Sequence, residues 1–259
     1  STWNSGNWLA SDEVAGLARV GPSLFILSGD SLHTYNTTNG VFATTYDLAT
    51  LGLANDGASL LHWSATGGAS PSVDALLVDD GSGNLIHLSP NQSPFIEGNI
   101  RLASAPSTDD MTALAEMDNI LYVGTGDNSM EVLRYDIGAS AWLTPWSVND
   151  NVVDMVVGPG AQQGTNSLFF AMEVSPVVEE MDGNGNSLQT YDGTSGCYPS
   201  TANLLDFAVD ANSVVFSLES GVFVHFDRAS GACTSYDTTN GLPTSFVGDV
   251  ALFGGTAYM

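Results

Sequence analysis

The chain has 259 residues, 43% of them hydrophobic and 13% charged, which is enough apolar sequence for an extensive core and too much for a disordered chain. Acidic residues number 29 and basic residues four, so the formal net charge is −25. Nucleic acids and anionic membranes are bound through cationic side chains, and no apolar run approaches the roughly 18 residues of a membrane span. We therefore expect no nucleic-acid partner and no membrane insertion.

Short apolar runs recur along the chain, and each is followed by a turn rich in glycine or acidic residues. These runs are Ser23–Leu27, Ala75–Val78, Ile120–Val123, Ser167–Phe170 and Val214–Phe216. Continuous apolarity of this length predicts strands that are buried on both faces. Each run is preceded by another apolar run and followed by two further segments, the last of which is more polar. The repeating unit is therefore four strands.

A four-strand unit with a half-polar last strand is typical of a β-propeller blade, and here it recurs roughly every 40–50 residues. We predict an all-β fold, a β-propeller of about six four-stranded antiparallel blades that forms a single domain over residues 1–259. The predicted blades span 13–56, 57–108, 109–150, 151–203 and 204–245, and a sixth at 246–259 is completed by residues 1–12. The alternative is a fragment of a seven-bladed propeller.

Three stretches carry an Asn-Gly-Leu-Pro-like turn followed by apolar strands: Asn240–Ser245, Asn7–Asp12 and Leu51–Asn55. They resemble the repeat of two-component regulator propellers, although the second copy lacks the Gly and the Pro. The turn Phe226–Gly231 is similar to the turns of quinoprotein-like propellers. The resemblance implies a propeller fold and an extracellular or periplasmic sensor or interaction domain.

The two cysteines, Cys197 and Cys233, occupy different places in the repeat. The repeat alignment puts one in a loop and the other at the start of an outer strand, at the opposite end of its sheet. Because bridged cysteines need Cα atoms within roughly 7 Å of each other, we predict no disulfide.

Acidic residues gather in the predicted loops on one face, where outer strands lead to the next blade and second strands lead to third strands. The candidate ligand-binding residues among them are Asp12, Asp30, Asp80, Asp127 and Glu219. Such loops could form a negative rim that concentrates cations. The alternative is that aspartate is simply a good turn former in an acidic protein. Adaptation to a salty environment is a further explanation of the acidity, because salt screens self-repulsion, and it would make the protein halophilic or marine.

Asp182, Asn184 and Asn186 place oxygen-bearing side chains at alternate positions, which matches the opening of a calcium loop. Calcium is the one cofactor that the sequence indicates. However, Ser187 stands where the loop needs glycine, Gly193 stands where it needs the closing glutamate, and the flanks are predicted strands. A hairpin turn is the alternative interpretation.

The leading functional hypothesis is a non-enzymatic, extracytoplasmic binding propeller with an acidic loop face. Its ligand would be a cation, a carbohydrate or another protein. One alternative is a carbohydrate-active enzyme, a glycoside hydrolase or lyase, because paired carboxylates can perform acid–base catalysis. The other is a structural segment of a larger surface protein. No catalytic constellation stands out, so the catalytic residues of an enzyme stay unknown.

Overall fold

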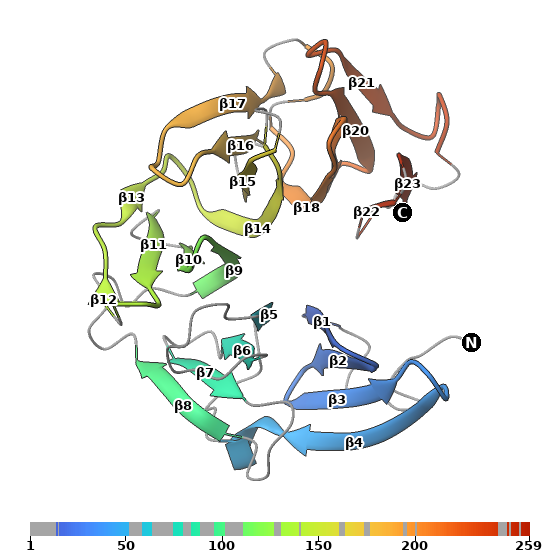
Figure 1. Ribbon diagram of the computed structural model, residues 1–259. Coiled ribbons are helices and arrows are strands. Elements are labelled where there is room, and N and C mark those ends of the chain that lie inside the picture. Colours follow the sequence, from blue (N-terminus) through green and yellow to red (C-terminus); the bar gives the residue numbers. More distant parts are fainter. Residues whose placement is uncertain are drawn as a thin grey trace. The chain divides into compact units, whose positions relative to one another are not determined.

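The computed structural model describes residues 14, 16–51, 59–63, 75–79, 84–88, 96–101, 111–126, 131–139, 141–160, 164–173, 177–193, 196–199, 201–242, 248, 250–253 and 255–259. Within these ranges the chain is almost entirely β-structure, and its helical content is the 3-10 turn η1 (Leu48–Leu51) (Figure 1). No helix in the described part of the chain is both long and apolar enough to span a membrane.

The strands up to Ser147 form three sheets, and in each sheet the strands lie side by side in chain order. The first sheet contains β1 (Gly16–Val20), β2 (Ser23–Ser28), β3 (Ser31–Asn36) and β4 (Val41–Asp47). The second contains β5 (Ser59–Trp63), β6 (Ala75–Asp79), β7 (Asn84–Leu88) and β8 (Ile96–Arg101). The third contains β9 (Met111–Met117), β10 (Ile120–Thr125), β11 (Glu131–Asp136) and a last strand in two pieces, β12 (Ala141–Trp142) and β13 (Trp146–Ser147).

The second half of the chain repeats the pattern. The fourth sheet contains β14 (Val152–Pro159), β15 (Asn166–Met172), β16 (Val177–Met181) and β17 (Ser187–Tyr191). The fifth contains β18 (Leu204–Val209), β19 (Ser213–Leu218), β20 (Val222–Asp227) and β21 (Cys233–Tyr236). A two-stranded sheet of β22 (Ala251–Phe253) and β23 (Thr256–Tyr258) follows.

The chain divides into two compact units. The first comprises residues 1–114, 119–121 and 133–144, and the second comprises 115–118, 122–132 and 145–259. The fourth sheet, the fifth sheet and the β22–β23 hairpin therefore all belong to the second unit, which contains the candidate site. The single domain and the completion of a sixth blade by residues 1–12 stay predictions, and residues 1–12 lie outside the described part.

The second strand of each fully described sheet is the most deeply buried, as its continuous apolar run predicts. Phe169 and Phe170 in β15 and Phe216 in β19 have no exposed surface. One cluster of buried residues joins the fourth and fifth sheets, with Phe169 and Val178 on one side and Phe207 and Phe216 on the other. A sheet that is apolar on both faces needs such a neighbour to keep water away from it.

Cys197 and Cys233 form a disulfide, with Cα atoms 6.1 Å apart and a sequence separation of 36. The prediction of no disulfide was therefore wrong. It assumed that the loop between β17 and β18 stays beyond the strand ends. Instead, Tyr198 of this loop is buried, with its ring 6.3 Å from that of Phe226. The loop lies along the fifth sheet and brings Cys197 to the end where Cys233 pairs with Phe226.

Removal of the disulfide should destabilise the second unit, because the bridge closes a long loop in the unfolded chain. For a loop of this length we expect the unfolding free energy to fall by about 2–4 kcal/mol. Thermal melting with and without dithiothreitol measures the effect, and the double variant Cys197→Ser, Cys233→Ser should melt low under both conditions. Equal melting temperatures for the oxidised and reduced chain would contradict this expectation.

Candidate functional site

Arg228 connects the fourth and fifth sheets. It follows β20 in the turn Asp227–Gly231, and its side chain lies against the fourth sheet. Its Nη2 donates to Glu180 Oε2 at 3.0 Å, and the two side chains are 6% and 0% exposed. Its Nε donates to Tyr191 Oη at 3.1 Å, and its Nη1 donates to the carbonyl oxygens of Pro159 and Asp210. The guanidinium carbon lies 5.0 Å from the ring centroid of Phe169.

This ion pair is buried and well supplied with hydrogen bonds, as a buried pair must be to offset its desolvation. Tyr191 donates its hydroxyl proton to Glu180 Oε2 at 3.0 Å. Burial raises the pKa of Tyr191 to about 12, so the donor stays protonated at neutral pH. We call the seat of Arg228 on the fourth sheet the arginine socket; it consists of Phe169, Val178, Glu180 and Tyr191.

The fifth sheet repeats the arginine socket in the same strand register. The register partners are Phe169–Glu180 and Val178–Tyr191 in the fourth sheet, and Val215–His225 and Phe223–Tyr236 in the fifth. His225 therefore stands where the fourth sheet has Glu180, and Tyr236 stands where it has Tyr191. The face is the same, but its charge differs because an imidazole replaces the carboxylate.

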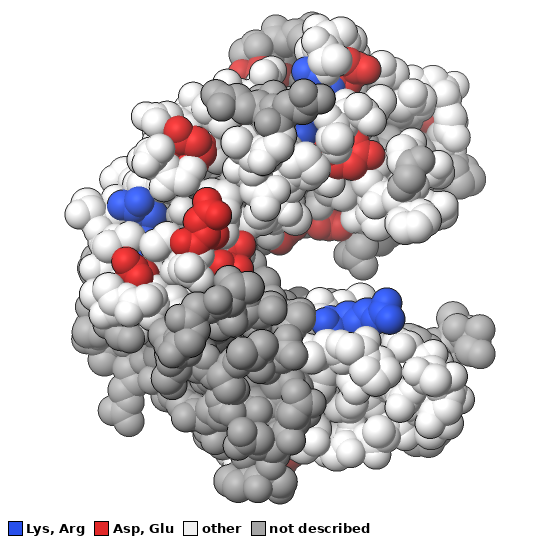
Figure 2. Space-filling model, viewed as in Figure 1, with Lys and Arg blue, Asp and Glu red and all other residues white. Residues whose placement is uncertain are grey.

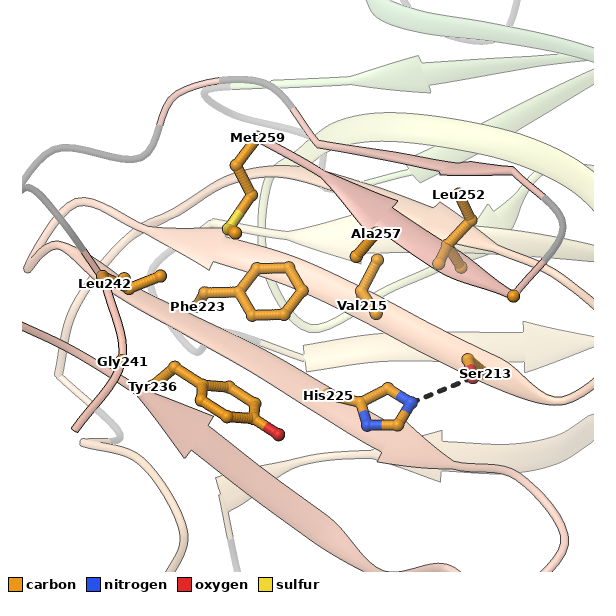
Figure 3. A pocket seen from close by; sticks show the side chains of 11 residues that line it. Ser213, Val215, Phe223, His225, Tyr236, Gly241, Leu242, Leu252, Ala257 and Met259 are labelled. Atoms are coloured by element: carbon orange, nitrogen blue, oxygen red, sulfur yellow. Dashed lines mark hydrogen bonds between the residues drawn. The ribbon is translucent and has the colours of Figure 1, made fainter.

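At this place on the fifth sheet the structure has a pocket of about 280 Å³. Its lining comes from the fifth sheet, the segment after it and the β22–β23 hairpin: Ser213, Val215, Phe223, His225, Tyr236, Gly241, Leu242, Leu252, Gly255, Ala257 and Met259. His225 Nε2 lies 2.9 Å from Ser213 Oγ in a shared hydrogen bond. Figure 3 shows the Tyr236 hydroxyl pointing toward His225, with Phe223 beside them and Leu252 and Ala257 on the opposite wall.

Two hydrogen bonds hold the segment that leads into β22 against the fifth sheet. Asp206 Oδ2 accepts the Val250 N–H at 2.6 Å, and Ser217 Oγ donates to the Gly248 carbonyl at 2.6 Å. Leu252 and Ala257 pack on a small cluster that contains Val215. The hairpin thus covers the inner part of the sheet face and leaves the pocket over the outer part.

Asp206 also interacts with Asp154 on β14 of the neighbouring sheet. Each of these aspartates sits at a bulge, and each accepts the N–H of the following residue through Oδ1. Burial, followed by the nearby charge of Asp206, raises the pKa of Asp154 to about 7. The pair therefore shares a proton at mildly acidic pH, as two adjacent carboxylates do.

The predicted ligand-binding residues lie in several places. Asp12, Asp80 and Asp127 lie outside the described residues. Asp30 lies in the β2–β3 turn of the first unit, and Glu219 lies in the β19–β20 turn of the second, where it accepts a hydrogen bond from Asn203. Acidic side chains appear as separate groups on the face shown in Figure 2. A common acidic rim stays a prediction.

Asp182, Asn184 and Asn186 lie in the turn between β16 and β17. Asp182 Oδ1 accepts the N–H groups of Asn184 and Asn186, and its Oδ2 accepts the Asn186 side-chain amide at 2.8 Å. These hydrogen bonds lower the pKa of Asp182. Gly185 has φ +86°, and a Cβ there would lie 2.6 Å from Trp146 Nε1. The turn thus has a packing role, and calcium binding stays a prediction.

No group of three or more His, Cys, Asp or Glu residues in the described ranges is arranged to hold a metal ion. The sequence pattern did not single out Ser213, His225 or Tyr236. It also missed Asp154 and Asp206. A signal for the aspartates was present, because Asn151–Asp154 and Asn203–Asp206 both read Asn, two apolar residues, then Asp.

Solved structures share this arrangement of sheets. The β-propeller domain of Myceliophteria thermophila Cps50 (Swd1) matches with a TM-score of 0.69 at 10% identity, over 93% of this chain and 77% of that one. The fold is a β-propeller. The computationally designed Ika8 protein matches with a TM-score of 0.62 at 14% identity, over 95% of this chain and 67% of that one. No family model and no curated protein matches the sequence.

These likenesses confirm the predicted fold class, and each four-stranded sheet is a blade. The resemblance to propeller repeats is confirmed at the level of the fold, and no family model supports the two-component regulator or quinoprotein families themselves. A propeller with this fold suggests a binding or interaction domain, although fold does not fix function.

Stability should decrease as the pH rises from about 4 to about 7. The folded-state pKa of Asp154, about 7, lies above its ordinary value of 3.8, so the folded chain binds this proton more tightly than the unfolded chain. Its stabilising contribution is complete below the unfolded-state pKa and is lost as the pH passes through the folded-state pKa. Asp154→Asn keeps the group neutral, so its urea unfolding free energy should depend less on pH and exceed that of the unsubstituted chain above pH 7.

The exposed residue Asp182 supplies the control for this experiment. Its pKa is lowered by hydrogen bonds, so Asp182→Asn should leave the slope of stability against pH between 5 and 8 unchanged. If stability depends on pH with the same slope in Asp154→Asn and in the unsubstituted chain between pH 5 and 8, then Asp154 and Asp206 do not share a proton.

Proposed function

We propose that this chain is a non-enzymatic binding propeller that acts outside the cytoplasm and holds its ligand in the pocket over the fifth blade. The pocket itself is the observation that carries the proposal. It has mostly apolar walls and a few polar groups at one end, the composition typical of ligand sites. Phe223 and Tyr236 supply aromatic surface, with ring centroids 6.0 Å apart.

The polar groups of the pocket suit an uncharged ligand group. His225, Ser213 and the Tyr236 hydroxyl can donate or accept hydrogen bonds, and Leu242, Leu252 and Ala257 offer only apolar surface. A ligand that buries an aromatic or aliphatic group and places one polar atom near His225 would satisfy both parts of the pocket.

The pocket does not favour the carbohydrate-active enzyme. Glycoside hydrolysis needs two carboxyl groups roughly 5–10 Å apart beside the bound sugar, and none of the described residues that line the pocket has a carboxylate side chain. Asp154 and Asp206 do form a carboxylate pair, but neither is among the described residues that line the pocket.

The disulfide supports an extracellular or periplasmic location, because such bonds persist in oxidising compartments and are rare in the cytosol. The net charge of −25 would attract a cationic ligand or a basic protein surface toward the acidic loops. In this proposal the charge assists the encounter and the pocket provides the contact. The acidity also suits a salty environment.

Indole is a suitable probe of the pocket, since it is a flat aromatic with one hydrogen-bond donor. We expect saturable binding by NMR titration, with shifts at residues of β20 and β23. Ala257→Leu fills the pocket and should weaken binding at least tenfold. Ala251→Leu is the matched control, because Ala251 is exposed on the same hairpin and does not line the pocket. Failure of indole to saturate, or equal effects of the two variants, would favour a structural segment instead.

A further inference from the structure

We propose that Asn36, at the start of the turn that joins β3 to β4 in the first blade (Figure 1), is an acceptor site for an N-linked oligosaccharide. The inference goes beyond the proposed function, because it adds a covalent modification at a residue that does not line the pocket. The two proposals share only the location outside the cytoplasm, and each is tested by its own experiment.

The sequence around Asn36 has the form that N-linked transfer requires. Asn36, Thr37 and Thr38 match the triplet of Asn, any residue except Pro, then Ser or Thr. A second match, at residues 91–93, precedes Pro94 and lies outside the described residues. A triplet this short also recurs by chance, so the inference depends on the structure around Asn36.

The triplet lies in an exposed turn with a defined conformation. Residues 37–40 are all exposed and follow the last residue of β3. The Gly40 N–H donates to the Asn36 carbonyl at 2.9 Å, and Gly40 has φ +72°, a conformation that glycine adopts easily. Thr37 donates both its backbone N–H and its hydroxyl to the Pro22 carbonyl at 2.8 Å. A surface turn of this kind suits an N-linked oligosaccharide, which is bulky and hydrated.

Hydrogen bonds within the turn determine which atom of the Asn36 amide stays available. Asn36 Oδ1 accepts the N–H of Thr38 at 2.9 Å and that of Asn39 at 3.2 Å. Because the atom that accepts two donors must be the oxygen, the other atom is Nδ2. Nδ2 has no hydrogen-bond partner among the described residues and is not one of their buried unpaired atoms, so it is open to solvent. Nδ2 is the atom to which the sugar is attached.

Transfer of a sugar to Nδ2 is compatible with the folded turn. The donor is an oligosaccharide carried on a lipid pyrophosphate. Its anomeric carbon forms a bond to Nδ2, and the bond from that carbon to the pyrophosphate oxygen breaks. The lipid pyrophosphate leaves, and the amide gives up one of its two protons to a base of the transferase. The product is still an amide with Oδ1 unchanged, so the hydrogen bonds from Thr38 and Asn39 persist in the modified chain.

The disulfide is a separate observation that supports the inference. The bond between Cys197 and Cys233 persists in an oxidising compartment, and N-linked oligosaccharides are typical of surface loops in secreted proteins. One route out of the cytoplasm would therefore supply both modifications.

Secretion of the full chain from insect cells tests the inference. An N-glycosidase in isotopically labelled water converts each modified asparagine to a labelled aspartate, which peptide mass spectrometry locates. We expect the label at Asn36. Thr38→Ala removes the third residue of the triplet and should lower the occupancy of Asn36 at least tenfold, whereas Thr38→Ser should keep it modified. Asn36 itself is left in place, because its side chain also accepts the hydrogen bonds of the turn.

Thr37→Ala is the matched control, because it removes a hydroxyl from the same turn and leaves the triplet complete, so its occupancy should equal that of the unsubstituted chain. A folded, secreted chain without sugar at Asn36, from cells whose own secreted proteins are glycosylated, would overturn the inference. A label at Asn91 alone, or equal loss in Thr37→Ala and Thr38→Ala, would overturn it as well. Indole binding is measured on the same secreted chain, so a failure here is distinguishable from a failure of the proposed function.

Discussion

The contact between the fourth and fifth blades combines two apolar sheet faces with one buried cation, Arg228. Apolar burial supplies most of the free energy there and is not directional. The ion pair with Glu180 and the hydrogen bond to Tyr191 are directional, so they define how one blade is seated on the other. The turn Asp227–Gly231 aims Arg228, and the disulfide at Cys233 fastens the strand that follows that turn.

The same blade face, repeated once further along the chain, produces the candidate site. His225 replaces the acidic partner, and the pocket lies where the cation would sit. The proposed binding site thus occupies the same place on the fifth blade as the blade-to-blade contact occupies on the fourth, with one charge changed. Asp206 contributes to both contacts, because it meets Asp154 on one side and the Val250 N–H on the other.

The fold was predictable from sequence because buried second strands such as Ser167–Phe170 are continuous apolar runs, and their recurrence indicates blades. The disulfide was not, because the path of a loop such as Asp192–Asn203 has no periodicity. The Arg228–Glu180 pair and the pocket depend on which side chains of two neighbouring sheets come together. The apolar pattern of a single strand carries no information about that. Aligning the third strands of two blades would have set His225 beside Glu180, and that substitution was the available signal.

A double-mutant cycle on Glu180 and Arg228 tests most directly whether the ion pair seats one blade on the other. Removing one partner leaves the other charge buried and unpaired, so Glu180→Gln and Arg228→Met should each cost about 3–5 kcal/mol in urea unfolding. The double variant should cost no more than either single variant, while Arg19→Met, at an exposed position, should stay within about 0.5 kcal/mol. Additive costs for Glu180→Gln and Arg228→Met would mean that the two side chains act independently and would contradict this account.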